Sequence, residues 1–422
     1  MADMTSVSGK RAVVSRRAAL KLATAGAAVL ACPAIVRAEA SELQVASLFD
    51  LSGNLNIYGI QEMNVSRYAI AAINEAGGVL GKKVVLHQYD TQSKIELYSR
   101  YAQEVGASDD ITAVVGGFTG ASREAARPVL SRNKKLLFFP TIDEGGECDR
   151  YCFMEGTDCV QQEGPLLDWA IKNGGKKIYV VAADYIYGHV ATAWTKALAT
   201  QKGGMVVGSE FIPLAVSDFA ATIRRIQGAQ PNVIMSNLVG ANHVAFYRQF
   251  AAAGLNKSIK IVSPVFGLGN EPTILTPEEG EGIVVAYSYF EALDNPENKK
   301  FLEGFKNVYP KAGVVTDTPC QVWNAWHQWK TAVELAGSTE IDKVVVALEK
   351  AAPFAGPAGT VKLDPECHRN IQDVHLARVH DQKYEIFQTF NQVAPTREVV
   401  GAGTCDLTGK DANSHRMIDP KF

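Results

Sequence analysis

The stretch LQVASLF at residues 43–49 is followed by IYGIQEMNVSRYAIAAINEAGG at residues 57–78 and VVLHQY at residues 84–89. The first and last segments are short and apolar, which is typical of buried strands. The middle one places Val65, Ala69, Ile73 and Ala76 on one helical face, and Gly77-Gly78 ends the helix, as glycine often does. Together they predict a β-α-β unit.

The same alternation continues outward to residue 289 in two series. The first series adds strands at 111–115 and 136–139, with helices near 93–106 and 121–132. The second has strands at 178–182, 205–211, 233–236, 259–263 and 283–287, and helices near 160–173, 188–201, 218–228 and 240–253. This order predicts the α/β class, with two doubly wound parallel-sheet lobes that carry helices on both faces.

After residue 289 the pattern changes. Helices are expected at 297–308, 318–336 and 341–349, and strands return at 360–363, 374–379 and 384–388. A Pro/Gly-rich bridge at 353–359 separates the two groups, and the tail 389–422 shows no periodicity. Trp323, Trp326 and Trp329 recur at about one helical turn, which indicates packing rather than a cofactor site.

Composition excludes several classes of protein. The chain has 422 residues, 47% of them hydrophobic and 21% charged, which is enough for two cores. The net charge is −3, and residues 1–38 hold six of the bases, so the remaining body is acidic. An acidic body without a basic stripe argues against nucleic-acid binding. Past the N-terminus, no apolar run reaches the roughly 20 residues that cross a bilayer.

Residues 1–40 are typical of an export signal, with a basic start, an apolar middle and small residues at the end. The segment SRRAALK at 15–21 resembles the twin-arginine pattern but has Ala19 where phenylalanine is usual, so general secretion and a retained anchor stay as alternatives. Cleavage after Ala38 or Ala40 is expected, and the mature protein then works outside the cytoplasm. Lipidation at Cys32 is an alternative, although Leu30 is bulky for a lipobox.

Six cysteines follow the signal, and an even count in an oxidising compartment predicts disulfides, with 15 pairings open and free thiols as the alternative. They are Cys148, Cys152, Cys159, Cys320, Cys367 and Cys405. The spacing of the first three lacks the C-x2-C pair of a zinc site. His368, His375 and His380 lie in the final strands, where structural positions are expected. We therefore predict no metal site and no cofactor.

Ligands of doubly wound sheets bind beyond the carboxyl ends of the strands. Polar and aromatic clusters follow several predicted strands, although any single cluster is also what an ordinary loop looks like. The helix after Gly120 offers backbone N–H groups to a carboxylate or carbonyl oxygen. The candidate ligand-binding residues are Phe118, Thr119, Gly120, Phe139, Thr141, Asp143, Tyr185, Tyr187, Val239 and Phe266.

Catalytic signatures are absent from the sequence. It holds no G-x-S-x-G, no H-E-x-x-H, no Walker A motif and no G-x-G-x-x-G after the first strand. Residues 267–269 read Gly-Leu-Gly but lack the third glycine and a following helix. We therefore expect a binding protein and no enzyme.

Several segments carry a resemblance to a known family. The strongest are INEAGGVLG at 73–81 and Pro140-Thr141 with Glu144-Gly145, and DYIY at 184–187 and GG-x-VVG at 203–208 add to them. The chain resembles the type I periplasmic solute-binding proteins of ABC importers, in the branch that binds urea, short-chain amides and branched-chain amino acids. The resemblance covers about residues 43–390.

This resemblance implies two lobes joined by three crossings, near residues 155, 288 and 356, that close on one small ligand for a membrane permease. The expected division is a signal at 1–40, lobe 1 at 41–155 plus 289–355, lobe 2 at 156–288 plus 356–390, and a tail at 391–422. It also implies that Phe118, Phe139, Thr141 and Tyr185 match pocket positions of the amide binders.

Two positions depart from the family pattern. Gly120 stands where the family usually has a serine that anchors the ligand, so backbone N–H groups or Ser122 would have to substitute. Asp143 stands where the urea and amide binders have an aromatic residue. A buried carboxylate needs a partner, so Asp143 predicts a ligand with NH donors. A ligand sensor of the same fold that feeds a signalling partner is the alternative function, and an enzyme on the same scaffold is the third.

Overall fold

The structure is a computed structural model that describes residues 42–421 apart from residue 270. The predicted export signal, with its twin-arginine segment and Cys32, lies outside the described residues. Within the described part, none of the helices has both the length and the apolar content that crossing a membrane requires.

Lobe 1 is our name for the sheet segment in the order β2-β1-β3-β4-β6 and the helices that cover it. All neighbouring strands in this segment are parallel. The strands are β1 (Glu42–Phe49), β2 (Lys83–Asp90), β3 (Ile111–Gly116), β4 (Leu136–Phe139) and β6 (Cys152–Met154). The helices are α2 (Asn56–Glu75), α3 (Ile95–Ala107), α4 (Gly120–Arg132), α11 (Pro296–Val308), α12 (Asp317–Ala336) and α13 (Ile341–Lys350).

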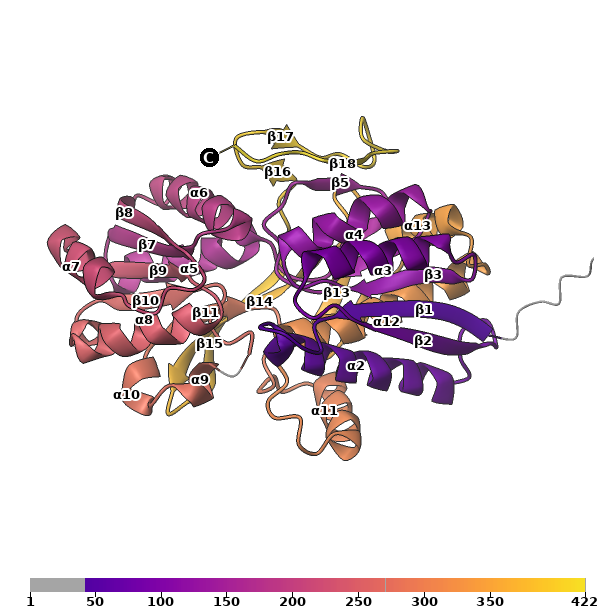
Figure 1. Cartoon of the computed structure of the whole chain (residues 1–422), viewed down its shortest axis with the longest axis horizontal. Helices are drawn as coiled ribbons and strands as arrows, with labels where there is room; N and C mark the ends of the chain where they lie inside the picture. The colour runs from indigo at the N-terminus through magenta and orange to yellow at the C-terminus, as the bar shows by residue number, and fades with distance from the viewer. Residues whose placement is uncertain (1–41, 270, 422) are drawn as a thin grey trace, which may run out of the picture. The chain divides into compact units, whose positions relative to one another are not determined.

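Alternate side chains of the lobe 1 strands enter two different cores. Val45 and Phe49 pack with residues of α2, α12 and α13, whereas Ala46 and Leu48 pack with residues of α3 and α4. In Figure 1, α3 and α4 lie on one side of β1 and α2 on the other. The sheet is therefore covered on both faces, as the sequence predicts.

Lobe 2 is the sheet segment in the order β11-β10-β9-β7-β8, which is also parallel throughout. Its strands are β7 (Lys177–Ala183), β8 (Met205–Ile212), β9 (Val233–Asn237), β10 (Lys260–Ser263) and β11 (Val284–Tyr287). Its helices are α5 (Cys159–Asn173), α6 (Ile186–Gln201), α7 (Ala220–Ala229), α8 (Ala241–Ala252), the short α9 (Glu271–Ile274) and α10 (Pro277–Gly280), and a 3-10 turn at Leu255–Lys257. The predicted α/β class is confirmed.

One long strand, β14 (Arg369–His380), joins the two segments into a single sheet. It begins beside β6 in lobe 1 and continues antiparallel to β11 in lobe 2. β12 (Phe354–Gly356), β13 (Gly359–Asp364) and β15 (Lys383–Val393) complete this region. A crossing was expected near residue 356, but Ala358 and Leu363 still pack in the lobe 1 core, and the chain crosses inside β14. The Pro/Gly-rich bridge forms the β12–β13 turn instead of a linker.

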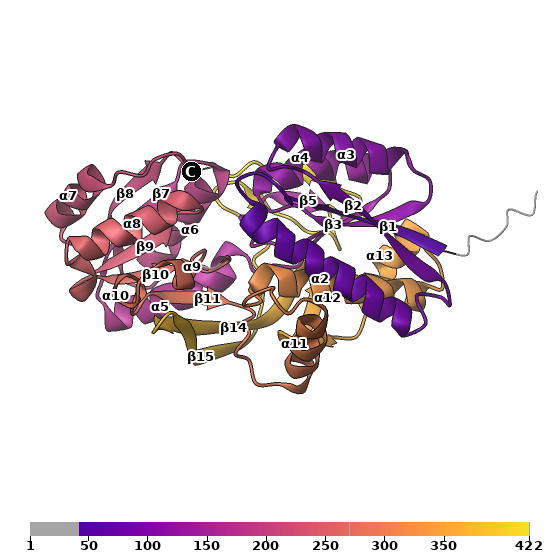
Figure 2. The same cartoon turned by 60° about the horizontal axis from the view of Figure 1, so that its bottom comes forward.

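Helix α2 and helix α12 pack against each other in lobe 1 (Figure 2). Trp326 and Trp329 of α12 are fully buried, which confirms their packing role, and Trp326 Nε1 donates to Ser66 Oγ at 2.7 Å. The end of α2 is also as predicted. Gly77 and Gly78 have φ of 102° and 75°, and Gly78 N donates to the carbonyl of Ile73. Only glycine adopts these angles at no steric cost.

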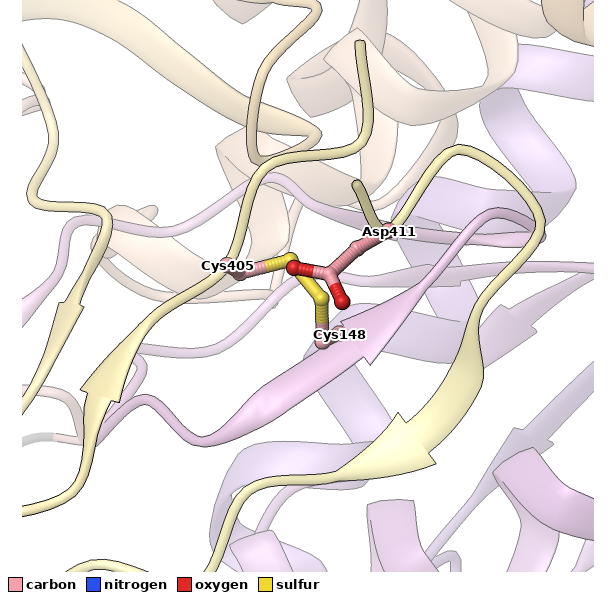
Figure 3. A group of neighbouring side chains, drawn as sticks. All are labelled: Cys148, Cys405 and Asp411. Atoms are coloured by element: carbon pink, nitrogen blue, oxygen red, sulfur yellow. A yellow bond between two sulfur atoms is a disulfide. The ribbon is translucent and has the colours of Figure 1, made fainter. Parts of the chain in front are cut away.

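The C-terminal tail forms strands too short for a sequence period to reveal. They are β16 (Glu398–Val399), β17 (Gly403–Thr404) and β18 (His415–Met417), and β18 pairs with β5 (Glu147–Asp149) of the chain before β6. A disulfide joins Cys148 of β5 to Cys405, 257 residues away (Figure 3). Disulfide formation is thus confirmed for one pair, whereas the other four predicted mature cysteines are buried free thiols.

Replacing both Cys148 and Cys405 with alanine is expected to destabilise the protein, because the bond closes a long loop in the unfolded chain. Losing a native disulfide typically costs about 2–5 kcal/mol. Urea unfolding of the oxidised and reduced wild type and of the double variant measures the loss. Cys320→Ala is the control. It removes a buried free thiol, and the stability of this variant should still fall when reductant is added. Equal midpoints for oxidised and reduced wild type would contradict this expectation.

Candidate functional site

The site begins at the N-terminus of α4, where Thr119 caps the helix. Ser122 N donates to Thr119 Oγ1 at 3.1 Å, and Ser122 Oγ accepts from the backbone N–H groups of Phe118 and Thr119 at 3.0 Å. Ser122 also donates to the Thr119 carbonyl at 2.7 Å. Its hydroxyl is therefore used by the cap, so Ser122 does not take the place of the serine that the family pattern has at position 120.

A pocket of about 20 Å³ lies between the lobes, at the carboxyl ends of their strands. Seven of the ten predicted residues line it: Phe118, Thr119, Gly120, Thr141, Tyr185, Tyr187 and Val239. Five further lining residues were not predicted: Tyr58, Ile142, Glu144, Val265 and Leu268. Tyr58 lies in α2, well beyond the end of β1, so a search among the residues that directly follow strands does not find it. Glu144 lies in the loop after β4, beside the predicted residues Thr141 and Asp143.

Aromatic rings form much of the pocket wall. Tyr58 stacks on Phe118 with ring centroids 4.2 Å apart, and the centroids of Tyr185 and Tyr187 are 6.0 Å apart. Tyr58 OH donates to Glu271 Oε1 of α9 at 3.2 Å, which links the lobes directly. The buried Tyr187 hydroxyl has no hydrogen-bond partner among the described residues. A buried unpaired hydroxyl is costly, so it is available to a ligand.

Two of the predicted aromatic residues lie outside the lining. Phe139 is fully buried in the lobe 1 core, with the Arg123 guanidinium 5.4 Å from its ring centroid. Phe266 is fully buried in the lobe 2 core, where its ring meets Tyr247 edge-on. Phe139 is the last residue of β4 and Phe266 follows β10, but both rings point into the cores, and a position at a strand end does not determine where a ring points.

Asp143 also lies outside the pocket lining, in a buried ion-pair network. Its Oδ1 accepts from Arg123 Nη1 at 3.0 Å, and its Oδ2 accepts from Arg369 Nε at 2.6 Å. Burial opposes ionisation, but the guanidiniums of Arg369 and Arg123 bring the pKa of Asp143 below its usual value. The protein itself supplies the partners that the sequence interpretation assigned to a ligand, so we withdraw Asp143 from the candidate site.

Glu144 explains the glycine at position 120. The Glu144 side chain is buried and its Oε1 lies 3.3 Å from Arg123 Nη2. A Cβ added to Gly120 would lie 1.6 Å from the same Oε1, so no side chain fits there while Glu144 keeps this position. Burial raises the pKa of Glu144 above its usual value, against the lowering effect of Arg123. A protein carboxylate thus stands where the family pattern has a serine hydroxyl.

A second cavity, of about 970 Å³, opens beside the N-terminal end of α2. Its lining includes Ile57 and Ile60 of α2 together with residues 308–314 and 382–384. None of the ten predicted residues lines it. The exposed apolar side chains of Ile57, Ile60, Val308 and Val314 make it a surface groove. The smaller pocket is where the residues at the strand ends of both lobes converge.

One group of potential metal ligands occurs in the described part of the chain. One ligand atom each of Cys148, Cys405 and Asp411 lies within 4.8 Å of the others (Figure 3). The two sulfur atoms are bonded to each other. Metals bind the thiolate, so in this oxidised form the group offers one carboxylate and no thiolate.

Comparisons with known proteins agree on one family. The family model described as periplasmic binding protein domain matches residues 43–398. Leu/Ile/Val-binding protein homolog 6 of Brucella melitensis is 23% identical over 66% of this chain and 72% of its own, and homolog 3 is 27% identical over 76% and 87%. A solute-binding protein of an ABC transporter from R. palustris, solved with 4-hydroxybenzoate, superposes with a TM-score of 0.75 at 24% identity, over 83% and 98% of the two chains. The chain therefore belongs to the periplasmic binding protein family.

Proposed function

We propose that the protein is the exported solute-binding component of an ABC importer. It captures a small amide, a urea-like compound or an amino acid between lobes 1 and 2 and delivers it to a membrane permease. The observation that carries this proposal is the buried inter-lobe pocket, whose wall combines aromatic rings with the capped N-terminus of α4. The combination of apolar walls and a few polar groups is typical of small-molecule sites. The 20 Å³ of this arrangement admits only a water-sized group, so the two lobes have to stand further apart when a solute is bound.

Direct contacts between the lobes support a closing motion. Tyr58 OH donates to Glu271, and Thr316 Oγ1 donates to the Leu268 carbonyl at 2.9 Å. These bonds form only while the lobes are together. A ligand that touches both lobes binds the closed arrangement better, and that difference in affinity shifts the population toward it. The permease would then recognise the closed form.

The proposed location is outside the cytoplasm, with export directed by the twin-arginine segment at residues 15–21. The names of the relatives widen the range of solutes to test. The Brucella proteins are named for leucine, isoleucine and valine, and the R. palustris protein was solved with an aromatic acid. Amino acids and aromatic acids therefore belong in the same panel as urea and amides.

A thermal-shift panel of the purified protein tests this function. A solute at one hundred times its dissociation constant, binding only the folded state, is expected to stabilise it by about 2.7 kcal/mol. Phe118→Ala should reduce the shift by removing a pocket wall, whereas Phe387→Ala, on exposed β15, should not. Catalytic turnover of the bound compound, in place of its stoichiometric release, would contradict a binding function.

A further inference from the structure

The residues that line the inter-lobe pocket include a negative charge and no positive charge. Of its twelve lining residues, Glu144 is the single carboxylate, and none is lysine, arginine or histidine. The four rings of Tyr58, Phe118, Tyr185 and Tyr187 add the negative faces of their π-systems. The pocket therefore favours a positive group over a neutral one and a neutral group over a negative one.

The ion-pair network behind the pocket leaves Glu144 incompletely balanced. Three buried carboxylates, Asp143, Glu144 and Glu147, share the guanidiniums of Arg123 and Arg369. Asp143 and Glu147 each contact both guanidiniums, whereas Glu144 has one contact, at 3.3 Å, with Arg123. Arg123 is shared further with Glu124 at 3.1 Å. Glu124 has its own partner in Arg127, at 2.6 Å. The three carboxylates Asp143, Glu144 and Glu147 therefore face two guanidiniums, and the carboxylate that faces the pocket, Glu144, has the fewest contacts with them.

The same carboxylate blocks an anionic ligand at the end of α4. Glu144 Oε1 occupies the space directly beside the Gly120 Cα, at the first residue of the helix. A helix N-terminus attracts negative charge, and here the protein supplies that charge itself. The carboxylate of an amino acid or an aromatic acid, brought to this helix end, would meet a like charge in a buried setting.

These three observations rest on the proposed function of solute capture and favour one ligand class over the neutral amides and the amino acids named there. We infer that the protein captures a small organic cation that has no carboxylate, such as an amine, an amidinium or a guanidinium compound. Glu144 pairs with its positive nitrogen, and the rings of Tyr58, Phe118, Tyr185 and Tyr187 surround it through cation–π contacts. The Tyr187 hydroxyl, unpartnered among the described residues, accepts one of its N–H groups.

Two isosteric series test the inference by calorimetry on the purified protein. Acetamidinium, acetamide and acetate share one shape with charges +1, 0 and −1, and guanidinium is compared with urea in the same way. We expect each cation to bind at least tenfold more tightly than its neutral isostere, and acetate not to bind. Glu144→Gln should abolish that tenfold preference, whereas Glu144→Asp should retain it.

Glu124→Gln is the matched control, because Glu124 contacts Arg123 but does not line the pocket. It should keep the preference for the cation. Tighter binding of acetamide, urea or acetate than of the cations would overturn the inference while leaving solute binding intact, and so would a preference unchanged in Glu144→Gln. If none of the cations binds while an amino acid or an aromatic acid stabilises the protein, the inference is also overturned. Failure of every solute in the wider panel would count against the proposed function itself.

Discussion

Arg369→Met is expected to lower the free energy of unfolding by about 3–5 kcal/mol at neutral pH, the range for breaking a buried ion pair from one side. Arg369 is buried at the start of β14, where it pairs with Asp143 Oδ2 at 2.6 Å and with Glu147. Methionine fills much of the same volume but leaves these two carboxylates short of a cation in the lobe 1 interior.

The pH dependence identifies the cause of this loss. The pKa of Asp143 in the folded protein lies below that of the unfolded chain, so its ion pairs stabilise the fold at neutral pH. That contribution is fully present above about pH 4, the ordinary pKa of an aspartate, and is lost progressively as the pH falls from there through the lower pKa of the folded state. The difference between wild type and Arg369→Met should therefore narrow at pH 3.

Arg378→Met is the matched control for urea unfolding at both pH values. It lies on the same strand and pairs with Glu385 at 3.1 Å, but both side chains are about half exposed. Exposed pairs contribute roughly 0–1 kcal/mol. Equal losses in the two variants, or a loss for Arg369→Met that does not depend on pH, would show that the buried network does not stabilise the fold.

Glu163→Gln is expected to stabilise the protein at alkaline pH. Glu163 of α5 is fully buried, its Oε2 accepts from Thr195 Oγ1 of α6 at 2.5 Å, and its Oε1 has no partner among the described residues. Burial raises its pKa from 4.5 to about 8, although the Thr195 hydrogen bond opposes this. The folded protein thus keeps the carboxyl protonated at neutral pH, and above pH 8 it must bury the charge.

The direction of the pH effect follows from the two pKa values. Because the folded state holds the proton more tightly, stability falls as the pH rises from about 4.5 to about 8 and stays low above that. At 1.4 kcal/mol per pH unit, the total loss has an upper bound of about 4–5 kcal/mol. Glutamine does not titrate, so the variant should escape most of this loss.

Urea unfolding at pH 5, 7 and 9 measures the effect. We expect the variant to be close to wild type at pH 5 and more stable than wild type at pH 9 by a few kcal/mol. Glu303→Gln, on the exposed part of α11, controls for the loss of one negative charge. If the difference between Glu163→Gln and wild type were the same at pH 5 and pH 9, Glu163 would not titrate as the burial argument requires.

The sequence was sufficient to predict the longer strands and helices of both lobes, since each of these carries a local apolar run or face. β5, β6 and β12 escaped prediction, because three residues are too few to show a period. The crossing of the chain from lobe 1 to lobe 2 inside β14 was also not predicted, for a different reason. Its position depends on Arg369 pairing with Met154, a long-range contact that no local pattern encodes.

The candidate site, too, was predicted in part and missed in part. Seven lining residues were predicted from their positions at the ends of strands, because the carboxyl ends of parallel strands meet at one edge of the sheet. The prediction chose Asp143 and left out Glu144, the adjacent acid in the same loop, because the position after a strand does not show which of the two faces the pocket. Arg369, 226 residues away, pairs with Asp143, and the absence of a side chain at Gly120 leaves room for Glu144. Which of two neighbouring carboxylates faces the pocket is thus decided by distant parts of the chain.

The position of β14 has a consequence for the order in which the molecule is made. This strand starts to leave the ribosome only after residue 368 has been added, when all the other strands of both lobes have already emerged. Until then β6 and β11 each present an open edge, and open edges are templates for pairing with another chain. Export of the folded protein would also complete the sheet in the reducing cytoplasm, before Cys148 and Cys405 can join. The strand that joins the two lobes is therefore made late in biosynthesis, and until it pairs, the open edges of β6 and β11 leave the nascent chain exposed to aggregation.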